Sequence, residues 1–351
     1  MDARQLLKAL SEAAGVSGFE QELEPLLREA FEPLVDEVRT DVLGSFIARK
    51  DGSGPPPRPS VMLAAHLDEI GMMVTKIDEQ GFLRLTRVGG MDKRILPGME
   101  VMVHGRRPLA GIIGTKPPHL LEPGESAKAL KIEDLFVDVG LDRERAQEAI
   151  AIGDLVTFHR PYIELANGLV SGKSLDDRCG VVAMYICLEW LKRLQVQADV
   201  YAVATAQEEI GGKGAIVSTY DIVPDVGIAI DVGHGDSPGV PEDHTSPLDK
   251  GPALAIGPNI HPKIHELLQK AAKDAGVPVS TEVVPGNSGT DAWNMQVSRS
   301  GVPTGLVSIP LRYMHTSVET LSFSDLERAG KLLAFFIATV DRSFVEGLTW
   351  S

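Results

Sequence analysis

The sequence predicts an α/β fold in which helices flank a mostly parallel sheet, with a small β-barrel-like domain inserted into the chain. Three observations indicate this fold. Helical and apolar strand patterns alternate after Gly172. The run Val61–Ala65 is apolar throughout, as in a strand covered on both faces. Residues 69–164 form short, closely spaced strand patterns separated by turns rich in Asp, Gly and Pro.

The larger unit begins with helices. Leucines over Leu6–Leu10 mark one helix face, and Ser17–Glu20 has the spacing of a capping box at the start of a second helix. A β pattern over Val38–Lys50 precedes the buried strand Val61–Ala65. We therefore expect residues 1–68 to form the first part of the larger unit.

The segment 69–164 is expected to form the inserted β-rich unit. One short helix pattern, Asp142–Ile150, interrupts it, and the Pro-rich segment Lys116–Pro123 is a candidate interface loop. The expected strands are Met72–Ile77, Phe82–Val88, Glu100–His104, Ile112–Thr115, Leu135–Val139 and Leu155–His159.

Residues 165–351 return to the larger unit, because helices there alternate with apolar strands. This alternation predicts an open, mostly parallel sheet. The expected helices are Asp177–Leu194, Gly212–Tyr220, Pro262–Ala275 and Ser324–Val345, and the expected strands are Val200–Ala206, Val226–Ile230 and Val302–Ile309.

Composition and charge restrict the partners. A content of 43% hydrophobic residues in 351 is typical of a globular protein of about two domains and excludes a disordered chain. The 34 Lys and Arg residues against 49 Asp and Glu residues leave a net charge of −15, which repels nucleic acids and anionic membranes. The longest apolar run, Cys179–Leu188, is too short to span a bilayer. We therefore expect no nucleic-acid or membrane partner.

The start of the chain and the cysteines indicate a cytoplasmic protein. Residues Met1–Gln5 lack the basic and apolar regions of a secretory signal. Cys179 and Cys187 lie on one predicted helix, where their Cα atoms would be about 12 Å apart. That separation is too long for a disulfide. Two buried, reduced thiols fit a reducing compartment.

Polar side chains follow the predicted strands where each strand ends. In open α/β sheets, ligands bind outside the carboxyl ends of the strands, so these side chains are expected to meet. They are His66 and Asp68 after the first apolar strand, Glu208 and Glu209 after the second, Asp231 after the third, His315 after the fourth, and Asp176 with Asp177 at the start of a helix.

Two imidazoles and several carboxylates suit a pair of divalent metals bridged by one carboxylate, with zinc the first choice and cobalt or manganese also compatible. Each motif has a simpler interpretation by itself. His66 could be a hydrogen-bonded structural residue, and paired acids such as Glu208–Glu209 and Asp176–Asp177 favour helix N-termini. Their coincidence at four strand ends favours metal, since the acidic cluster would otherwise be repulsive.

Ordered motifs along nearly the whole chain resemble those of the dinuclear metallo-aminopeptidases, whose members include glutamyl and deblocking aminopeptidases and form tetrahedral (TET) particles of twelve subunits. The motifs are Ala65-His66-Leu67-Asp68-Glu69-Ile70-Gly71, Lys116-Pro117-Pro118-His119-Leu120, Gly153-Asp154, Ser174-Leu175-Asp176-Asp177-Arg178-Cys179-Gly180, Gln207-Glu208-Glu209-Ile210-Gly211, Asp231-Val232, Gly289-Thr290-Asp291-Ala292 and Ile309-Pro310-Leu311-Arg312-Tyr313-Met314-His315-Thr316.

The resemblance implies a role for each site residue. His66 and Asp231 would hold one metal, Glu209 and His315 the other, and Asp176 would bridge both. Glu208 would act as the general base, and Asp68 would orient the imidazole of His66. A cis peptide is expected at Asp176–Asp177.

The resemblance also implies an organisation and an activity. Residues 1–68 and 165–351 would form a zinc-peptidase-like catalytic domain, and residues 69–164 an oligomerisation domain for dimers and a tetrahedral dodecamer. The expected activity is removal of N-terminal residues from short peptides. An N-acyl amino acid deacylase needs the same metals and base, and a non-catalytic metal-binding scaffold is a third possibility. The presence of Glu208 argues against a non-catalytic scaffold, because a purely structural metal site needs no base that is not a ligand.

Overall fold

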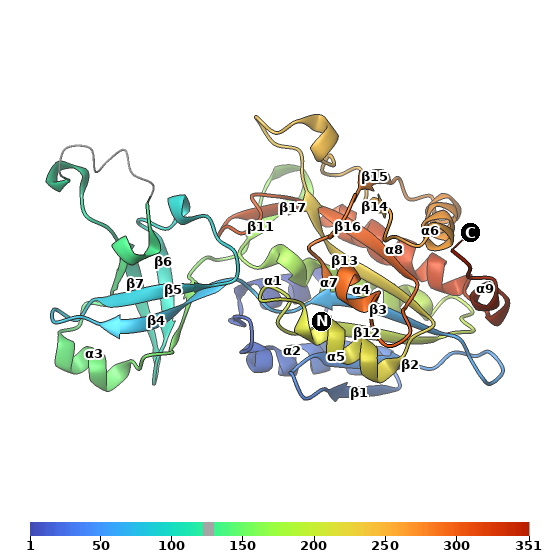
Figure 1. Ribbon diagram of the computed structural model, residues 1–351, viewed down its shortest axis with the longest axis horizontal. Helices are drawn as coiled ribbons and strands as arrows, with labels where there is room; N and C mark the ends of the chain where they lie inside the picture. The colour runs from blue at the N-terminus through green and yellow to red at the C-terminus, as the bar shows by residue number, and fades with distance from the viewer. Residues whose placement is uncertain (122–129, 351) are drawn as a thin grey trace.

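The computed structural model describes residues 1–121 and 130–350 and contains two separate β-structures, a large mixed sheet and a closed barrel (Figure 1). The barrel stands to one side of the large sheet. The predicted fold class, a helix-flanked sheet with an inserted barrel, is therefore confirmed. Part of the candidate interface loop Lys116–Pro123 lies in 122–129, outside the described residues.

Four parallel strands form the centre of the large sheet. They are adjacent in the order β12 (Asp199–Thr205), β3 (Ser60–His66), β13 (Val226–His234) and β16 (Thr304–Arg312). Because they run in one direction, their carboxyl ends meet at one edge of the sheet. The parallel arrangement predicted from the apolar runs is confined to these central strands and to the pair β14–β15.

The outer strands make the sheet mixed, because each joins it through an antiparallel pairing apart from β15. The outer strands are β1 (Glu37–Thr40) and β2 (Phe46–Lys50) beyond β12, β17 (Glu319–Ser322), β11 (Leu169–Gly172) and β10 (Ile163–Glu164) beyond β16, and the side pair β14 (Ala253–Ile256) and β15 (Ser280–Val283).

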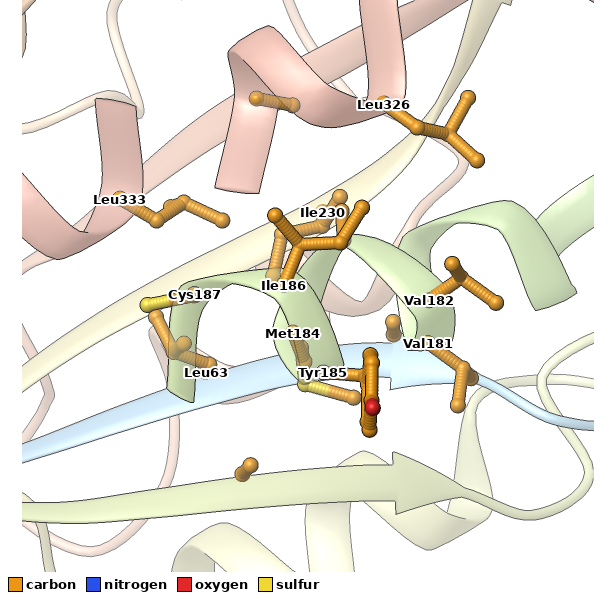
Figure 2. Close-up of a cluster of buried hydrophobic side chains, with 14 of the residues drawn as sticks. Leu63, Val181, Val182, Met184, Tyr185, Ile186, Cys187, Ile230, Leu326 and Leu333 are labelled. Atoms are coloured by element: carbon orange, nitrogen blue, oxygen red, sulfur yellow. The ribbon is translucent and has the colours of Figure 1, made fainter. Parts of the chain in front are cut away.

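Strand β3 is covered on both faces, which explains its unbroken apolar run. Leu63 faces the larger core cluster, where helices α4 and α8 pack, whereas Met62 and Ala64 face a smaller cluster under α5 and α7. Figure 2 shows Leu63, Ile186 and Leu333 among the buried side chains of the larger core. The helices on that side are α1 (Ala3–Glu12), α2 (Glu24–Phe31), α4 (Leu175–Leu191), α6 (Pro262–Ala275) and α8 (Phe323–Ala338). Those on the other side are α5 (Lys213–Ile222) and α7 (Asp291–Met295).

The barrel closes in the order β4-β5-β8-β7-β6-β9 and has a hydrophobic core of its own, with Val74, Leu83 and Val156 fully or almost fully buried. Its elements are β4 (Gly71–Ile77), β5 (Leu83–Val88), β6 (Glu100–His104), β7 (Pro108–Gly114), β8 (Phe136–Asp138), α3 (Arg143–Ala149) and β9 (Leu155–Phe158).

Two local predictions are wrong. Ser17–Glu20 does not cap a helix, because Ser17 donates to Asp68 and Glu20 accepts from the backbone of Gly18 and Gln207. The β pattern over 38–50 is confirmed, and it is divided into β1 and β2 by a turn in which Asp41 accepts from backbone N–H groups. The helix expected over 324–345 is divided as well, because Asp341 caps a separate helix, α9 (Arg342–Glu346).

Short 3₁₀ turns complete the described chain, and no helix within 1–121 and 130–350 is long and apolar enough to cross a membrane. Both cysteines lie buried on α4 with free thiols. The 3₁₀ turns are Glu20–Leu23, Glu32–Leu34, Lys93–Ile95, Pro118–Leu120, Ile132–Asp134, Ala166–Gly168 and Glu242–His244.

Candidate active site and metal centre

A cavity of about 580 Å³ opens at the carboxyl ends of the central parallel strands. His66 at the end of β3 and Asp231 near the end of β13 line it. Glu208 and Glu209, which follow β12, and His315, which follows β16, line it as well. The structure therefore brings these predicted residues together in one cavity with Asp176, whereas Asp68 and Asp177 do not line it.

Two groups of possible metal donors lie in this cavity and share one residue. His66, Asp176 and Asp231 form the first group, and Asp176, Glu209 and His315 form the second. Within each group the donor atoms lie within 4.8 Å of one another. Asp176 belongs to both, as a bridging carboxylate would, and the grouping is the one that the motifs imply.

Asp176 joins the two imidazoles directly. Its Oδ1 is 2.9 Å from Nε2 of His66, and its Oδ2 is 3.3 Å from Nε2 of His315, which also lies 3.3 Å from Oε1 of Glu209. Burial alone would raise the pKa of Asp176, but the hydrogen bonds with His315 and His66 lower it. Hydrogen bonds to Asp176 and Glu209 raise the pKa of His315 to about 11.

The carboxylate of Asp177 fixes the turn that carries Asp176. The peptide between the two aspartates is cis, as the motifs imply. Asp177 Oδ1 accepts from the backbone N–H of Gly180 at 3.1 Å, and Oδ2 accepts from that of His66 at 3.3 Å. A Cβ on Gly180 would lie 2.5 Å from Asp177 Oδ2, so only glycine allows this approach.

Asp68 is fully buried and binds the loop that carries the two glutamates. Its Oδ1 accepts from the backbone N–H of Glu208 at 2.9 Å, and its Oδ2 accepts from that of Glu209 at 3.1 Å and from the Ser17 hydroxyl. The ring of His66 contacts the backbone carbonyl oxygen of Asp68 at 3.1 Å, whereas the carboxylate is 3.6 Å away. The main chain of Asp68 therefore orients the imidazole, and its side chain orients the glutamates.

Glu319 is a positioning residue that sequence reasoning missed. Its Oε2 accepts from the backbone N–H of Asp176, and its Oε1 accepts from that of His315, both at 3.0 Å. Burial raises its pKa well above the usual range. The burial of its strand, β17, depends on the completed fold and has no local sequence pattern that would indicate it.

A second cluster that the sequence analysis did not predict lies next to the turn that holds Asp176. It consists of Glu69, Lys173 and Arg178, all of which are buried. Lys173 Nζ lies 2.7 Å from Glu69 Oε2 and donates to the carbonyl oxygen of Ala13 at 2.8 Å. The Arg178 guanidinium donates to Leu67 O at 3.1 Å and to Ala13 O at 2.7 Å. These contacts tie the end of β3 to both sides of the turn that holds Asp176. Burial lowers the pKa of Lys173 to about 8.

Glu208 lines the cavity but belongs to neither donor group among the described residues. Burial, with the nearby charges of Asp291 and Glu209, raises its pKa to about 8. A carboxyl group with such a pKa can accept and return a proton near neutral pH.

The residues present fit two divalent cations. Nitrogen and oxygen donors in two groups of three suit zinc and related borderline metals. Burial and the charge of Asp177 raise the pKa of Asp231 well above its usual range, so the cavity disfavours an unneutralised carboxylate. Divalent cations would neutralise the negative charges of the carboxylates that lie close together in the cavity.

Comparisons with known proteins identify the family of this chain. The M42 glutamyl aminopeptidase family matches residues 44–332. A lysyl aminopeptidase from Pyrococcus furiosus is 37% identical over 336 residues, covering 93% of this chain and 94% of that protein.

Solved structures superpose on almost the whole length of this chain. A TET aminopeptidase from Thaumarchaeota archaeon SCGC AB-539-E09 superposes with a TM-score of 0.93 at 32% identity, covering 99% of each chain. The TET1 peptidase of Pyrococcus horikoshii, which can assemble into a tetrahedron or a large octahedral shell, gives 0.84 at 30% identity, covering 97% of this chain and 100% of that one. With a family match over most of its length and a TET-type fold, this chain belongs to the M42 glutamyl aminopeptidase family and is an aminopeptidase.

Proposed function

We propose that this aminopeptidase depends on two divalent metal ions and hydrolyses the N-terminal peptide bond of short peptides. The observation that carries the proposal is the pair of donor groups sharing Asp176, with Glu208 beside them in one cavity. His66 and Asp231 would hold one ion, and Glu209 and His315 the other. Zinc suits this donor set best, and cobalt or manganese also fits.

The proposed mechanism divides the work between the ions and Glu208. Two ions at this site would polarise the scissile carbonyl and lower the pKa of a water molecule. The Glu208 carboxylate accepts a proton from the attacking water and then donates it to the amide nitrogen as the C–N bond breaks. Asp68 and Glu319 hold the backbone around Glu208, Asp176 and His315, so the reacting groups keep their geometry.

We also propose the division of labour predicted from the sequence. Residues 1–68 and 165–351 would form the catalytic domain, and residues 69–164 the assembly domain, which contains the closed barrel with its own core. The TET1 peptidase assembles into closed particles, and a twelve-subunit tetrahedron built from dimers is proposed here. An enclosed site would admit short peptides and exclude folded proteins. The free cysteines fit a cytoplasmic location.

The proposal is tested with aminoacyl reporter substrates after metal removal and after readdition of zinc, cobalt or manganese. We expect turnover to disappear on chelation and to return with metal. N-acetylated amino acids are assayed in parallel, because their preferential cleavage would identify an N-acyl amino acid deacylase. Metal binding without turnover of either substrate would identify a non-catalytic scaffold.

A further inference from the structure

One carboxylate in the cavity has no part in the proposed mechanism. Glu282 on β15, an edge strand next to β14, lines the cavity together with the donor groups. Ser308 on β16 donates a hydrogen bond to its Oε2 at 2.5 Å. Because Ser308 is paired in register with Asp231, this bond holds the Glu282 carboxylate on the metal side of the sheet.

Gly233 lies next to the Glu282 carboxylate and relates it to the donor groups. A Cβ on Gly233 would lie 3.5 Å from Glu282 Oε1 and 3.1 Å from the Cβ of Ser308. Gly233 is two residues beyond Asp231 on β13, a distance of about 7 Å along a strand. The Glu282 carboxylate therefore lies about one amino-acid side chain away from the donor groups.

Glu282 is the one carboxylate among the described residues of the cavity that has neither a proposed metal nor a proposed proton-transfer role. Five carboxylates line it, and three of them belong to the donor groups, where divalent ions would neutralise them. Glu208 exchanges its proton during the proposed reaction. Among the described residues no Lys or Arg lines the cavity, and the hydrogen-bond partner of the Glu282 carboxylate is the Ser308 hydroxyl.

A second cavity continues beyond Glu282. It has a volume of about 220 Å³ and shares Gly233, His234 and Glu282 with the first. Its other polar walls include Asp243 and Thr281, and no Lys or Arg lines this cavity either within the described parts of the chain. A long side chain that reaches the shared wall of the two cavities therefore meets the Glu282 carboxylate and, among the described residues, no Lys or Arg.

We infer that Glu282 makes this site selective for peptides whose first residue is basic, by pairing with the ammonium of lysine or the guanidinium of arginine. The inference rests on the proposed peptidase function and names its substrate class. The four-carbon stem of lysine can bridge the interval between the donor groups and Glu282. Glu282 determines specificity and takes no part in bond cleavage.

The test compares 7-amido-4-methylcoumarin derivatives of lysine, arginine, norleucine and glutamate with the metal-loaded protein. Norleucine has the four-carbon side chain of lysine without the terminal ammonium, so the ratio of their kcat/KM values reports the contribution of that group. We expect lysine to be preferred over norleucine by about 10- to 100-fold, the range for hydrogen bonds to charged groups. Glu282→Gln should bring that ratio close to one while changing norleucine cleavage little.

Two further variants sharpen the test. Glu282→Lys should favour the glutamate reporter over norleucine, because the charge is reversed. Glu242→Gln is the matched control: Glu242 is exposed, precedes Asp243 of the second cavity and lines neither cavity itself, so the lysine-to-norleucine ratio of this variant should stay that of the unchanged protein.

Failure of the inference is distinguishable from failure of the proposed function. Equal losses for all four reporters in Glu282→Gln would show that Glu282 contacts a group common to every substrate and would overturn the inference. The absence of a lysine preference in the unchanged protein would also overturn it. If no reporter is cleaved, the proposed function fails, and calorimetry with lysinamide against norleucinamide still tests Glu282. Equal affinities would overturn the inference, and a preference for lysinamide that Glu282→Gln abolishes would support it.

Discussion

The Asp68 carboxylate accepts a hydrogen bond from the backbone N–H of Glu208 at 2.9 Å, and its other oxygen accepts from Glu209 at 3.1 Å. One buried side chain therefore sets the position of both the proposed base and a proposed metal ligand. Glu319 does the same for Asp176 and His315. The site is built on two carboxylates that belong to neither donor group among the described residues.

Asp68→Asn should lower kcat by about 10- to 100-fold, the usual effect of losing a residue that orients metal-site groups. An asparagine side chain has only one acceptor oxygen, so it cannot hold both backbone N–H groups. Steady-state kinetics with metal in excess measures the effect. Ser17→Ala is the control, because it removes a hydroxyl donor and leaves both carboxylate acceptors. Normal turnover in Asp68→Asn would contradict this role.

Glu208→Gln should keep close to two metal ions per chain and lower kcat at least a hundredfold, because general acid–base catalysis contributes about 10² to 10⁴. The amide has nearly the size of the carboxylate but cannot carry the proton. Metal analysis and kinetics on the same sample provide the measurement. Near-normal turnover would remove Glu208 from the mechanism.

Asp176→Ala should weaken both metal positions, whereas His66→Ala should weaken mainly one. The reason is that Asp176 belongs to both donor groups and His66 to the first alone. Stepwise metal titration followed by calorimetry separates the two cases. Identical losses in the two variants would exclude a bridging role for Asp176.

Lys173 should make stability depend on pH. Burial lowers its pKa from 10.5 to about 8, so between these values the unfolded chain holds a proton that the folded chain has lost. The free energy of unfolding should therefore rise with pH across this window, by about 3 kcal/mol in total. The cost of the buried charge is fully present below pH 8.

Urea unfolding of the unchanged protein and of Lys173→Met, at equal chain concentration, isolates this contribution. The unchanged protein should gain stability relative to the variant as the pH rises from about 8 to 10.5. Lys192→Met is the matched control, because Lys192 pairs with Glu189 on the surface. A difference between protein and variant that stays constant with pH would refute the assignment.

Assembly should depend on the barrel. Ile112 on β7 and Ile152 before β9 are 48% and 72% exposed, and apolar side chains of this kind are expected in contacts between subunits. The double variant Ile112→Glu/Ile152→Glu should shift light-scattering mass from a large particle to smaller species. Val42→Glu, at a position that is 92% exposed on the turn between β1 and β2, is the control. An unchanged protein that is monomeric both with metal and after chelation would refute the cage.

The central strands and the residues at their ends could be predicted because the signal is local. The run Val61–Ala65 is buried on both faces, and the polar residues that follow such runs fall at one sheet edge by topology. The outer strands could not be predicted as readily. β10 has two residues and is a strand because β11 pairs with it, and β17, with the sequence Glu-Thr-Leu-Ser, is a strand because it pairs with both β16 and β11.

The contacts that hold the site residues in place were harder to predict, because the two partners of each contact lie far apart in the sequence. Ser17 has the spacing of a helix cap, but its hydroxyl partner is Asp68, 51 residues away. Lys173 has no local pattern that indicates burial, and its partner Glu69 is 104 residues away. Local spacing shows which side chains can bind metal, whereas the side chains that hold them depend on the completed fold.

The order of the donors along the chain has a consequence for biosynthesis. The first donor group is complete once the chain has been made as far as Asp231, but the second needs His315, and Glu319 comes later still. Glu319 also holds the backbone of Asp176, which both donor groups share, so neither proposed metal position takes its final geometry before residue 319 has been made. Peptidase competence would arise only when the strand that precedes His315 joins the sheet, so a nascent chain on the ribosome could not yet degrade other peptides.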